Sequence, residues 1–329
     1  MKQIRVGVAG VGAIGKNHAR VLGGLGVLTA IYDADKAHAA AVAAEYGGEV
    51  AGSLEELMAL TDAVTLATPT VTHFSMGSLL LEGGKHLLIE KPITDNTDEA
   101  RQLIELAKAR GCVLQVGHIE RFNPVLSLLE AMLDHPQFIE AHRLSPFPNR
   151  SIDIGVVLDL MIHDLEIILH LVRSEIESID AVGVPVLTRR EDIANARLRF
   201  KNGCVANITA SRISPERLRK IRVFQNDCYL SLDYQAQEGK IFRREGATIS
   251  QEDVILAREE PLQLELAAFV ECETLDGNHI QEILEHGRIM NPPSTKPPAP
   301  PAAEVEPRTA PVDTKPEEDL PGGLAGAPA

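Results

Sequence analysis

The chain has 329 residues, of which 44% are hydrophobic and 24% charged, as in globular proteins with enough length for two domains. Its formal net charge of -15 argues against a nucleic-acid partner, because binding to phosphate backbones needs clustered Lys and Arg. No apolar stretch reaches membrane-spanning length, and neither a signal peptide nor a CxxC pair is recognisable, so we expect a cytoplasmic protein with buried thiols.

The first 120 or so residues alternate between short apolar strands and helices. Residues 4–9 are apolar and β-branched, which is typical of a buried parallel strand. Similar strands are expected at 27–32, 63–67, 86–89 and 112–116, with helices between them at 15–22, 36–46, 54–60, 73–82 and 97–109. This alternation predicts an α/β fold with a Rossmann-type doubly wound parallel sheet.

After Arg121 the pattern becomes that of an α+β domain. A long apolar helix is expected around Val156 to Val172, followed by runs with period two at 196–200, 204–210, 219–225, 228–234 and 240–244. The tripeptide Lys201-Asn202-Gly203 predicts a hairpin turn between the first two runs. We therefore expect a large, mostly antiparallel, open-faced sheet with a helix packed on it.

The last part of the chain has a different composition. Residues 291–329 hold 11 of the 20 prolines and almost no large apolar side chains. Such a segment buries too little surface to offset its ordering entropy, so we expect a disordered tail; binding of its proline-rich stretches to a partner is the alternative. The predicted parts are a dinucleotide-binding domain at 1–122, a substrate and oligomerisation domain at 123–290, and the tail at 291–329.

A GxGxxG turn at Gly10, Gly12 and Gly15 follows the first strand and opens a helix. Asp33 ends the second strand, at the distance expected of a carboxylate that binds the adenosine ribose. This carboxylate disfavours the 2′-phosphate of NADP, so we expect NAD, although nearby Lys36 weakens that preference; capping of the next helix is the alternative role of Asp33. The predicted cofactor-binding residues are Gly10, Gly12, Ala13, Ile14, Gly15, Asp33, Thr68, Pro69, His73, Glu90 and Lys91.

Three side chains are candidates for the chemistry. Lys91 follows a strand and precedes a proline, whose peptide bond has ready access to the cis form. Asp159 and His163 are four residues apart on the apolar helix and share one face, and burying charge there without a purpose is costly. A structural Asp–His pair or a metal site are the alternatives, but no further ligands complete a coordination shell, and we expect no metal.

A nicotinamide site combined with Lys91 and His163 points to oxidation of a secondary alcohol. The imidazole is suited to accept the hydroxyl proton near neutral pH while hydride leaves for the nicotinamide ring. Lys91 would polarise the substrate oxygen, and Asp159 would orient the pair. A catalytically silent NAD-binding sensor is the rival of a different class, but it would need no proton acceptor.

The sequence resembles the Gfo/Idh/MocA oxidoreductase family over about residues 3 to 270. The resemblance rests on GVAGVGAIGKNHAR, on Asp33 at a strand end, and on ATPTVTHF, EKP and DLMIHD in family order. It implies an open-faced second domain, catalytic roles for Lys91 and His163 with help from Asp159, a cis Lys91–Pro92 bond, and a homodimer or homotetramer formed through the sheet. The chain departs from the family pattern at 277–290, where a closing helix runs into the tail.

The stretch QVGHIERFNP at 115–124 resembles a narrower group, the UDP-N-acetylglucosamine 3-dehydrogenases, which oxidise the sugar 3-hydroxyl to a ketone. A nucleotide sugar is therefore the expected substrate; a free polyol, sugar or sugar acid, such as an inositol, is the alternative. Guanidinium groups suit a diphosphate. The predicted substrate-binding residues are Arg121, Asn123, Arg143, Arg150 and His163, although we expect one of the three arginines to be an ordinary surface residue.

Overall fold

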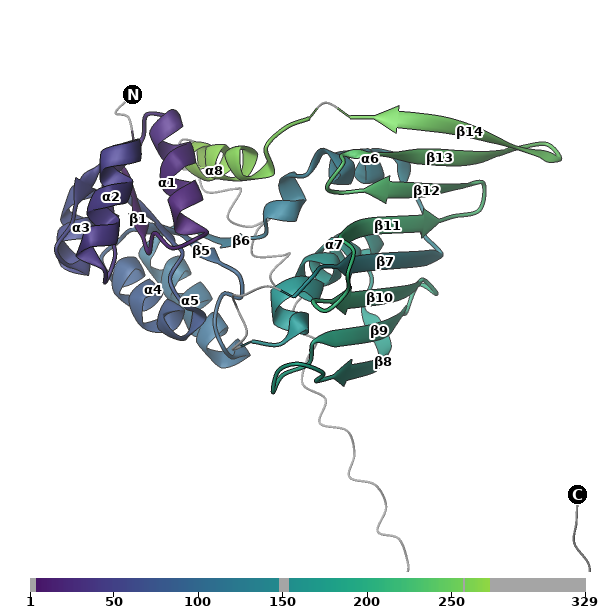
Figure 1. The fold of residues 1–329 in the computed structure, drawn as a ribbon, viewed down its shortest axis with the longest axis horizontal. Helices are drawn as coiled ribbons and strands as arrows, with labels where there is room; N and C mark the ends of the chain where they lie inside the picture. Colours follow the sequence, from purple (N-terminus) through teal and green to yellow (C-terminus); the bar gives the residue numbers. More distant parts are fainter. Residues whose placement is uncertain (1–3, 148–153, 257, 273–329) are drawn as a thin grey trace, which may run out of the picture. The chain divides into compact units, whose positions relative to one another are not determined.

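The computed structural model describes residues 4–147, 154–256 and 258–272, and these form two sheets with their helices (Figure 1). Across these ranges, no helix combines the length and the apolar character needed to cross a bilayer. The first sheet has six parallel strands in the order β3-β2-β1-β4-β5-β6, and the second has eight strands. The predicted combination of a doubly wound sheet with a larger open-faced sheet is confirmed.

The N-terminal half alternates strands and helices as predicted. Its elements are β1 (Val6–Ala9), α1 (Gly15–Gly24), β2 (Leu28–Tyr32), α2 (Lys36–Tyr46), β3 (Glu49–Val50), α3 (Leu54–Leu60), β4 (Ala63–Leu66), η1 (Thr70–Thr72), α4 (His73–Glu82), β5 (His86–Glu90), α5 (Thr97–Arg110) and β6 (Leu114–Gly117). Two separate clusters of buried apolar side chains lie against this sheet, one with α1 and α2 and the other with α3, α4 and α5. Helices therefore cover both faces, which explains why the strands read as continuous apolar runs.

The second half is built on the eight-stranded sheet. Its elements are η2 (Ile119–Phe122), α6 (Pro124–Met132), β7 (Phe138–Leu144), η3 (Val157–Met161), α7 (Ile162–Val172), β8 (Ile176–Val184), β9 (Ile193–Phe200), β10 (Val205–Ser211), β11 (Leu218–Phe224), β12 (Cys228–Asp233), β13 (Glu238–Glu245) and β14 (Thr248–Ile255). The strand order is β14-β13-β12-β11-β7-β10-β9-β8, and only β7 and β10 pair in parallel. The sheet is therefore mostly antiparallel, as predicted.

One face of this sheet packs on helices α6 and α7 in a single apolar cluster. Along β7 the burial alternates residue by residue, with Ile139, Ala141 and Arg143 on the helix-covered face. On the opposite face a row of four aromatic rings crosses the strands β7, β11, β12 and β13, formed by Phe138, Phe224, Tyr229 and Phe242. The period of two in the sequence thus reports a half-covered sheet.

The long apolar helix is present, but it begins differently from a regular α-helix. Residues Val157–Met161 form a π-helical turn, which leads into α7. Single π turns inside helices are rare and are frequent at functional sites. The predicted helix bounds of 156 and 172 agree with the structure, whereas the π turn has no signature in the sequence.

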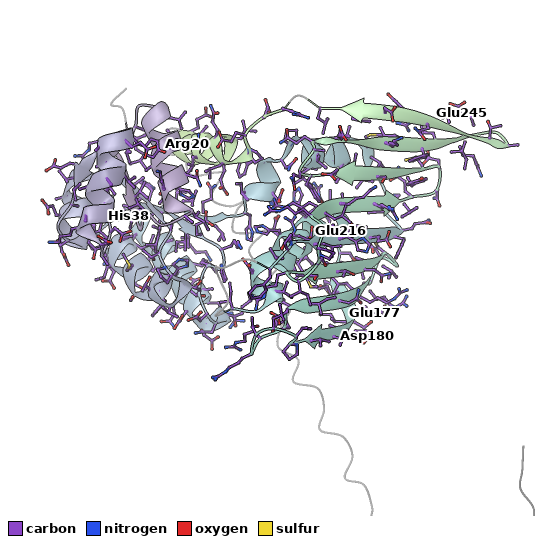
Figure 2. The ribbon with its side chains drawn as sticks, viewed as in Figure 1. Arg20, His38, Glu177, Asp180, Glu216 and Glu245 are labelled. Carbon is purple, nitrogen blue, oxygen red and sulfur yellow. The ribbon has the colours of Figure 1, made fainter. Side chains whose placement is uncertain are left out.

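The final described helix, α8 (Pro261–Cys272), packs with the N-terminal half. Its buried side chains Leu262, Leu266 and Phe269 belong to the same apolar cluster as α1 and α2. Arg20 of α1, labelled in Figure 2, forms an ion pair with Glu260 at the start of this helix. The sequence placed these residues in the second domain, and the domain boundaries stay a prediction. The stretch at 277–290 and the tail lie outside the described residues.

Candidate active site

The glycine-rich turn between β1 and α1 has the space that a dinucleotide needs. Gly10 has a φ of +82°, and a Cβ there would meet Thr68 Cγ2 at 2.7 Å. A Cβ on Gly15 would collide with the carbonyl of Gly10, so only glycine lets the helix approach the strand. Around Gly12, in contrast, an added Cβ meets nothing within 4 Å. This open position at the start of α1, whose cap residue Ile14 makes no side-chain cap bond, fits a diphosphate.

Asp33 lies directly after β2 and faces the glycine-rich turn. Its Oδ2 accepts a hydrogen bond of 2.8 Å from the Val11 amide, and its Oδ1 accepts one of 2.9 Å from the Asp35 amide. Asp35, not Asp33, caps helix α2, because its side chain accepts from the amides of Ala37 and His38. The helix-cap alternative for Asp33 is therefore wrong. The carboxylate holds the turn and keeps lone pairs for ribose hydroxyls.

The ends of β4 and β5 are tied together behind this turn. The buried ring of His73 contacts the Thr68 carbonyl through Nε2 at 2.8 Å and the Pro92 carbonyl through Nδ1 at 3.0 Å. Glu90 Oε1 lies 3.1 Å from Nε2 of the fully buried His18 on α1. His73 and Glu90 therefore hold in place the segments that carry Thr68 and Lys91. The polar side-chain atoms of both residues contact other groups of the protein.

Lys91 meets the helix of the second half. The Lys91–Pro92 bond is cis, as the resemblance implies. The Lys91 Nζ donates a hydrogen bond of 2.8 Å to the main-chain carbonyl of Asp159 and lies 3.5 Å from its Oδ1. Burial lowers the pKa of the Lys91 ammonium, while the carboxylates of Asp159 and Glu90 oppose this effect. The ammonium is therefore held between the two halves, close to a carboxylate.

His163 lies one helical turn beyond Asp159 and beside this lysine. Its Nδ1 is buried and has no hydrogen-bond partner among the described residues. Burial lowers its pKa well below 6.5, and the positive charges of Arg143 and Lys91 lower it further. The imidazole is therefore held in its neutral form, which is the form that can accept a proton. The structure thus brings Lys91, Asp159 and His163 into one site.

Arg143 of β7 is 2% exposed and is surrounded by carboxylates. Its Nε and Nη2 donate to Asp164 at 2.8 and 3.1 Å, and its Nη1 donates to Glu120 at 2.8 Å. Burial disfavours the guanidinium charge, but Asp164 and Glu120 outweigh this and raise the Arg143 pKa. This arrangement differs from the substrate contact predicted from the sequence, because protein carboxylates occupy the guanidinium nitrogens.

The other predicted substrate residues are distributed differently. Asn123 is 3% exposed and caps helix α6: its Oδ1 accepts from the Val125 amide, and its Nδ2 donates to Glu120 and to the Tyr234 carbonyl. Arg121 is more accessible and pairs through Nε with Glu166 of α7. Arg150 lies outside the described residues. Further along the helix that carries Asp159 and His163, Glu166 and His170 form a separate polar seam with Arg121 and Glu130.

Two side chains that the sequence did not single out lie at this site. Burial lowers the pKa of His118, whose Nδ1 is also buried without a partner among the described residues. Arg219 precedes β11's buried run, opposite Arg143 in the strand register, and 45% of its side chain is exposed. Its Nη1 lies 3.7 Å from Glu120, and its charge also lowers the His163 pKa. The position of Arg219 at the site follows from the pairing of β11 with β7, and no local signal in the sequence indicates it.

Comparison with known proteins identifies the family. The family model described as "Oxidoreductase family, NAD-binding Rossmann fold" matches residues 4–118, and the model described as "GFO/IDH/MocA C-terminal domain" matches residues 128–228. Together these cover more than half of the chain. The chain belongs to the Gfo/Idh/MocA oxidoreductase family. It is therefore an NAD-dependent oxidoreductase, and the glycine-rich turn and Asp33 described above fit its cofactor.

Relatives from bacteria agree with this assignment. UDP-N-acetylglucosamine 3-dehydrogenase of Acidithiobacillus ferrooxidans is 40% identical over 277 residues, which are 82% of this chain and 88% of the relative. A solved structure of the enzyme of that name from the same organism superposes with a TM-score of 0.80 over 88% of this chain and 97% of its own, at 37% identity. More distant is the scyllo-inositol 2-dehydrogenase (NAD(+)) of Bacillus subtilis, 30% identical over 65% of this chain and 68% of the relative.

Proposed function

We propose that the chain oxidises a secondary hydroxyl of a nucleotide sugar to a ketone with NAD, and that the substrate is UDP-N-acetylglucosamine, oxidised at its 3-hydroxyl, or a related compound. The observation that carries this is the meeting of Lys91, Asp159 and His163, from two halves of the chain, in one buried site. The 40% identity to a UDP-N-acetylglucosamine 3-dehydrogenase supports the choice of substrate.

His163 is the proposed general base. A neutral imidazole can accept the proton as the substrate hydroxyl becomes a carbonyl. NAD⁺, which the glycine-rich turn and Asp33 would hold, would supply the acceptor for the hydride that leaves the same carbon; the alcohol would thus lose two electrons, and the proton would stay on the imidazole. Release of that proton to solvent returns the imidazole to its neutral form for the next turnover.

Lys91 is proposed to hold and polarise the reacting oxygen. An ammonium group stabilises the negative charge that develops on that oxygen during proton removal. Asp159 contributes twice, through its carboxylate, which favours the charged form of Lys91, and through its carbonyl, which fixes the direction of the Nζ. Desolvation strengthens both interactions, because Lys91 and Asp159 are 12% and 19% exposed.

The arginines supply the proposed specificity for an anionic substrate. Arg121 and Arg219 are the partly exposed guanidinium groups near the site, and we propose that they, with Arg150, bind the substrate diphosphate. Arg143 and Asn123 are buried and bonded to protein groups. Their proposed role is to shape the site, and in particular to keep positive charge next to His163.

A turnover assay tests this function. The purified protein is incubated with NAD and UDP-N-acetylglucosamine, NADH formation is followed by absorbance, and the product is analysed by mass spectrometry for loss of two hydrogens. We expect both signals together. Loss of NADH formation in His163→Ala assigns the activity to this site. Turnover of inositol or glucose with none of any nucleotide sugar would refute the proposed substrate.

A dehydrogenase of a free polyol is the second candidate. It is favoured by the inositol dehydrogenases among the relatives, including the 30% identical Bacillus subtilis protein. The exposed guanidinium of Arg219 discriminates between the two, since a neutral polyol has no charge for it to bind. Arg219→Gln should raise KM for a nucleotide sugar about tenfold or more, and should leave KM for a neutral polyol nearly unchanged.

A cytoplasmic homo-oligomer is also part of the proposal. The face of the eight-stranded sheet opposite α6 and α7 carries the four-ring aromatic row, and aromatic side chains are enriched where proteins associate. Pairing of two such faces would give a homodimer, and two dimers a homotetramer. Analytical ultracentrifugation gives the mass, and Tyr229→Asp with Phe242→Asp should reduce it to that of a monomer.

A further inference from the structure

The helix that carries Asp159 and His163 begins without a cap of its own. Its cap position is Val156, which has no side chain able to accept a hydrogen bond from the first turn. The first amides of a helix need acceptors from outside the helix, and uncapped ends fray. In this helix the first turn is also the π turn that contains Asp159.

The missing acceptors come from another part of the chain, the loop 185–192 between β8 and β9. The Val156 amide donates to the main-chain carbonyl of Glu191 at 2.9 Å, and the Val157 amide donates to Glu191 Oε1 at 3.4 Å. One residue thus supplies both acceptors, and its carboxylate also lies at the positive end of the helix dipole. The contact is close, because a Cβ on Gly155 would collide with the Glu191 carboxylate.

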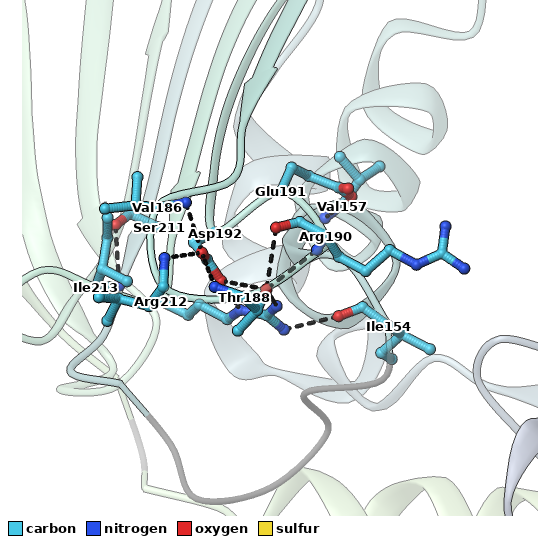
Figure 3. Close-up of polar contacts among 11 residues, drawn as sticks. Ile154, Val157, Val186, Thr188, Arg190, Glu191, Asp192, Ser211, Arg212 and Ile213 are labelled. Carbon is cyan, nitrogen blue, oxygen red and sulfur yellow. Dashed lines mark hydrogen bonds and ion pairs between the residues drawn. The ribbon is translucent and has the colours of Figure 1, made fainter.

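The loop is itself held rigidly by a buried ion pair (Figure 3). Asp192 and Arg212 are both 0% exposed, and Arg212 Nε donates to Asp192 Oδ1 at 2.9 Å. Asp192 Oδ2 accepts from the amides of Val186, Leu187 and Thr188 at 2.6 to 2.8 Å. These bonds lower the Asp192 pKa far below its usual range, so the carboxylate stays charged. The hydrogen bonds of Asp192 therefore also fix the position of the adjacent Glu191.

The Asp192–Arg212 ion pair, here called the clamp, also contacts the chain just before the helix. Arg212 Nη1 donates to the Ile154 carbonyl at 2.7 Å, while the main-chain carbonyl of Asp192 accepts from the Arg212 amide at 3.0 Å. Residues 154 to 157 are thus fixed by Arg212 on one side and Glu191 on the other, as Figure 3 shows. Two residues further on, Asp159 receives the Lys91 hydrogen bond.

We propose that Glu191 is a positioning residue for the oxidation reaction, which caps the helix of Asp159 and His163 from the clamped loop and so fixes Asp159 against Lys91. This inference rests on the proposed roles of Asp159 and His163. It assigns Glu191 no contact with substrate or cofactor.

The first test is hydrogen exchange, which needs no substrate. In Glu191→Ala we expect the amides of residues 155–161 to exchange about tenfold faster, the usual effect of losing a helix cap. Glu191→Gln retains an acceptor oxygen and should exchange close to the wild-type rate. Arg190→Ala is the matched control, since its side chain points away from the cluster in Figure 3. Wild-type exchange in Glu191→Ala would overturn the proposal.

Gly155→Ala tests the same contact from the opposite side. Its Cβ would push the Glu191 carboxylate away from the helix, so it should accelerate exchange as Glu191→Ala does. Because Glu191→Ala and Gly155→Ala remove the same interaction, the double variant should exchange no faster than either single variant. Additive effects would show that the contact is not shared, and would refute the capping role.

Kinetics then separate positioning from general stability. With whichever alcohol the wild type oxidises, Glu191→Ala should lower kcat about tenfold with unchanged KM for NAD, and Glu191→Gln should restore most of it. Unchanged kcat in Glu191→Ala, or no rescue by Gln, would overturn the proposal. Failure of the proposed substrate leaves this test intact, because exchange and rescue do not depend on which alcohol is used.

Discussion

Removing the charge of Asp159 tests the proposed role of Lys91 most directly. Asp159→Asn leaves the main-chain carbonyl that accepts the 2.8 Å bond from Lys91 Nζ and preserves the shape of the side chain. Only the negative charge 3.5 Å from Nζ is lost. At that separation the attraction is about 5 kcal/mol for an effective dielectric constant of about 20, and about 1 kcal/mol for that of water.

The direction of the effect follows from the charge of lysine. Asp159 opposes the burial that lowers the Lys91 pKa, so its loss lowers that pKa further. Lysine is cationic below its pKa, and the proposed mechanism needs the cation. The alkaline limb of kcat/KM should therefore move to lower pH by about one pH unit or more, since one unit corresponds to about 1.4 kcal/mol.

The assay measures initial rates of NADH formation from neutral to alkaline pH for the wild type and for Asp159→Asn. Asp180→Asn is the control, because Asp180 is an exposed residue of β8, labelled in Figure 2. It should leave the profile unchanged. An alkaline limb that stays in place in Asp159→Asn, or that moves to higher pH, would refute an essential Lys91 cation stabilised by Asp159.

Three further predictions concern the base, the cofactor and the fold. His163→Ala should reduce kcat by about 10²- to 10⁴-fold with nearly unchanged NAD affinity by calorimetry; wild-type turnover would remove His163 from the mechanism. Asp33→Ala should weaken NAD binding and narrow the preference over NADP in competition titrations, because the carboxylate both binds ribose and holds the Val11 amide; an unchanged preference would assign ribose recognition elsewhere. Phe269→Ala should lower the free energy of unfolding by about 3–5 kcal/mol in denaturant titrations. Ile249→Ala, at a side chain 72% exposed, should change it by less than about 0.5 kcal/mol, and equal losses would contradict the packing of α8.

The local parts of this protein could be predicted from its sequence. The glycine-rich turn, the strands of the first sheet and the helix with Asp159 and His163 each have a periodicity or a motif within a short window. For the same reason the hairpin around Asn202 was predictable, and β9 and β10 pair antiparallel on either side of it. Strands β7, β8 and β14 of the second sheet were missed. The strand β7 does alternate in burial, but β8 and β14 lack the alternation of a half-buried strand, and every residue of β8 after Ile176 is exposed.

The distant contacts could not be predicted in this way. Arg143 was expected to meet substrate because guanidinium groups suit a diphosphate. Its burial depends on Asp164 and Glu120, which lie 21 and 23 residues away in sequence. Arg219 likewise reaches the site only through the pairing of β11 with β7, and Glu191 meets the helix of Asp159 only through the loop between β8 and β9. Tertiary neighbours decide whether a charged side chain faces a ligand or another residue. The sequence around that side chain does not decide it.

The return of α8 to the first half has a consequence for synthesis. Arg20 and Glu260 are 240 residues apart, so nearly the whole described chain must leave the ribosome before they can meet. Until then the nascent nucleotide-binding half lacks the Leu262, Leu266 and Phe269 side chains that fill its core beside α1. Closing such a long loop is slow and entropically costly. Completion of the dinucleotide fold therefore waits until α8 has been synthesised, and a fragment ending near residue 122 would carry an uncovered apolar face.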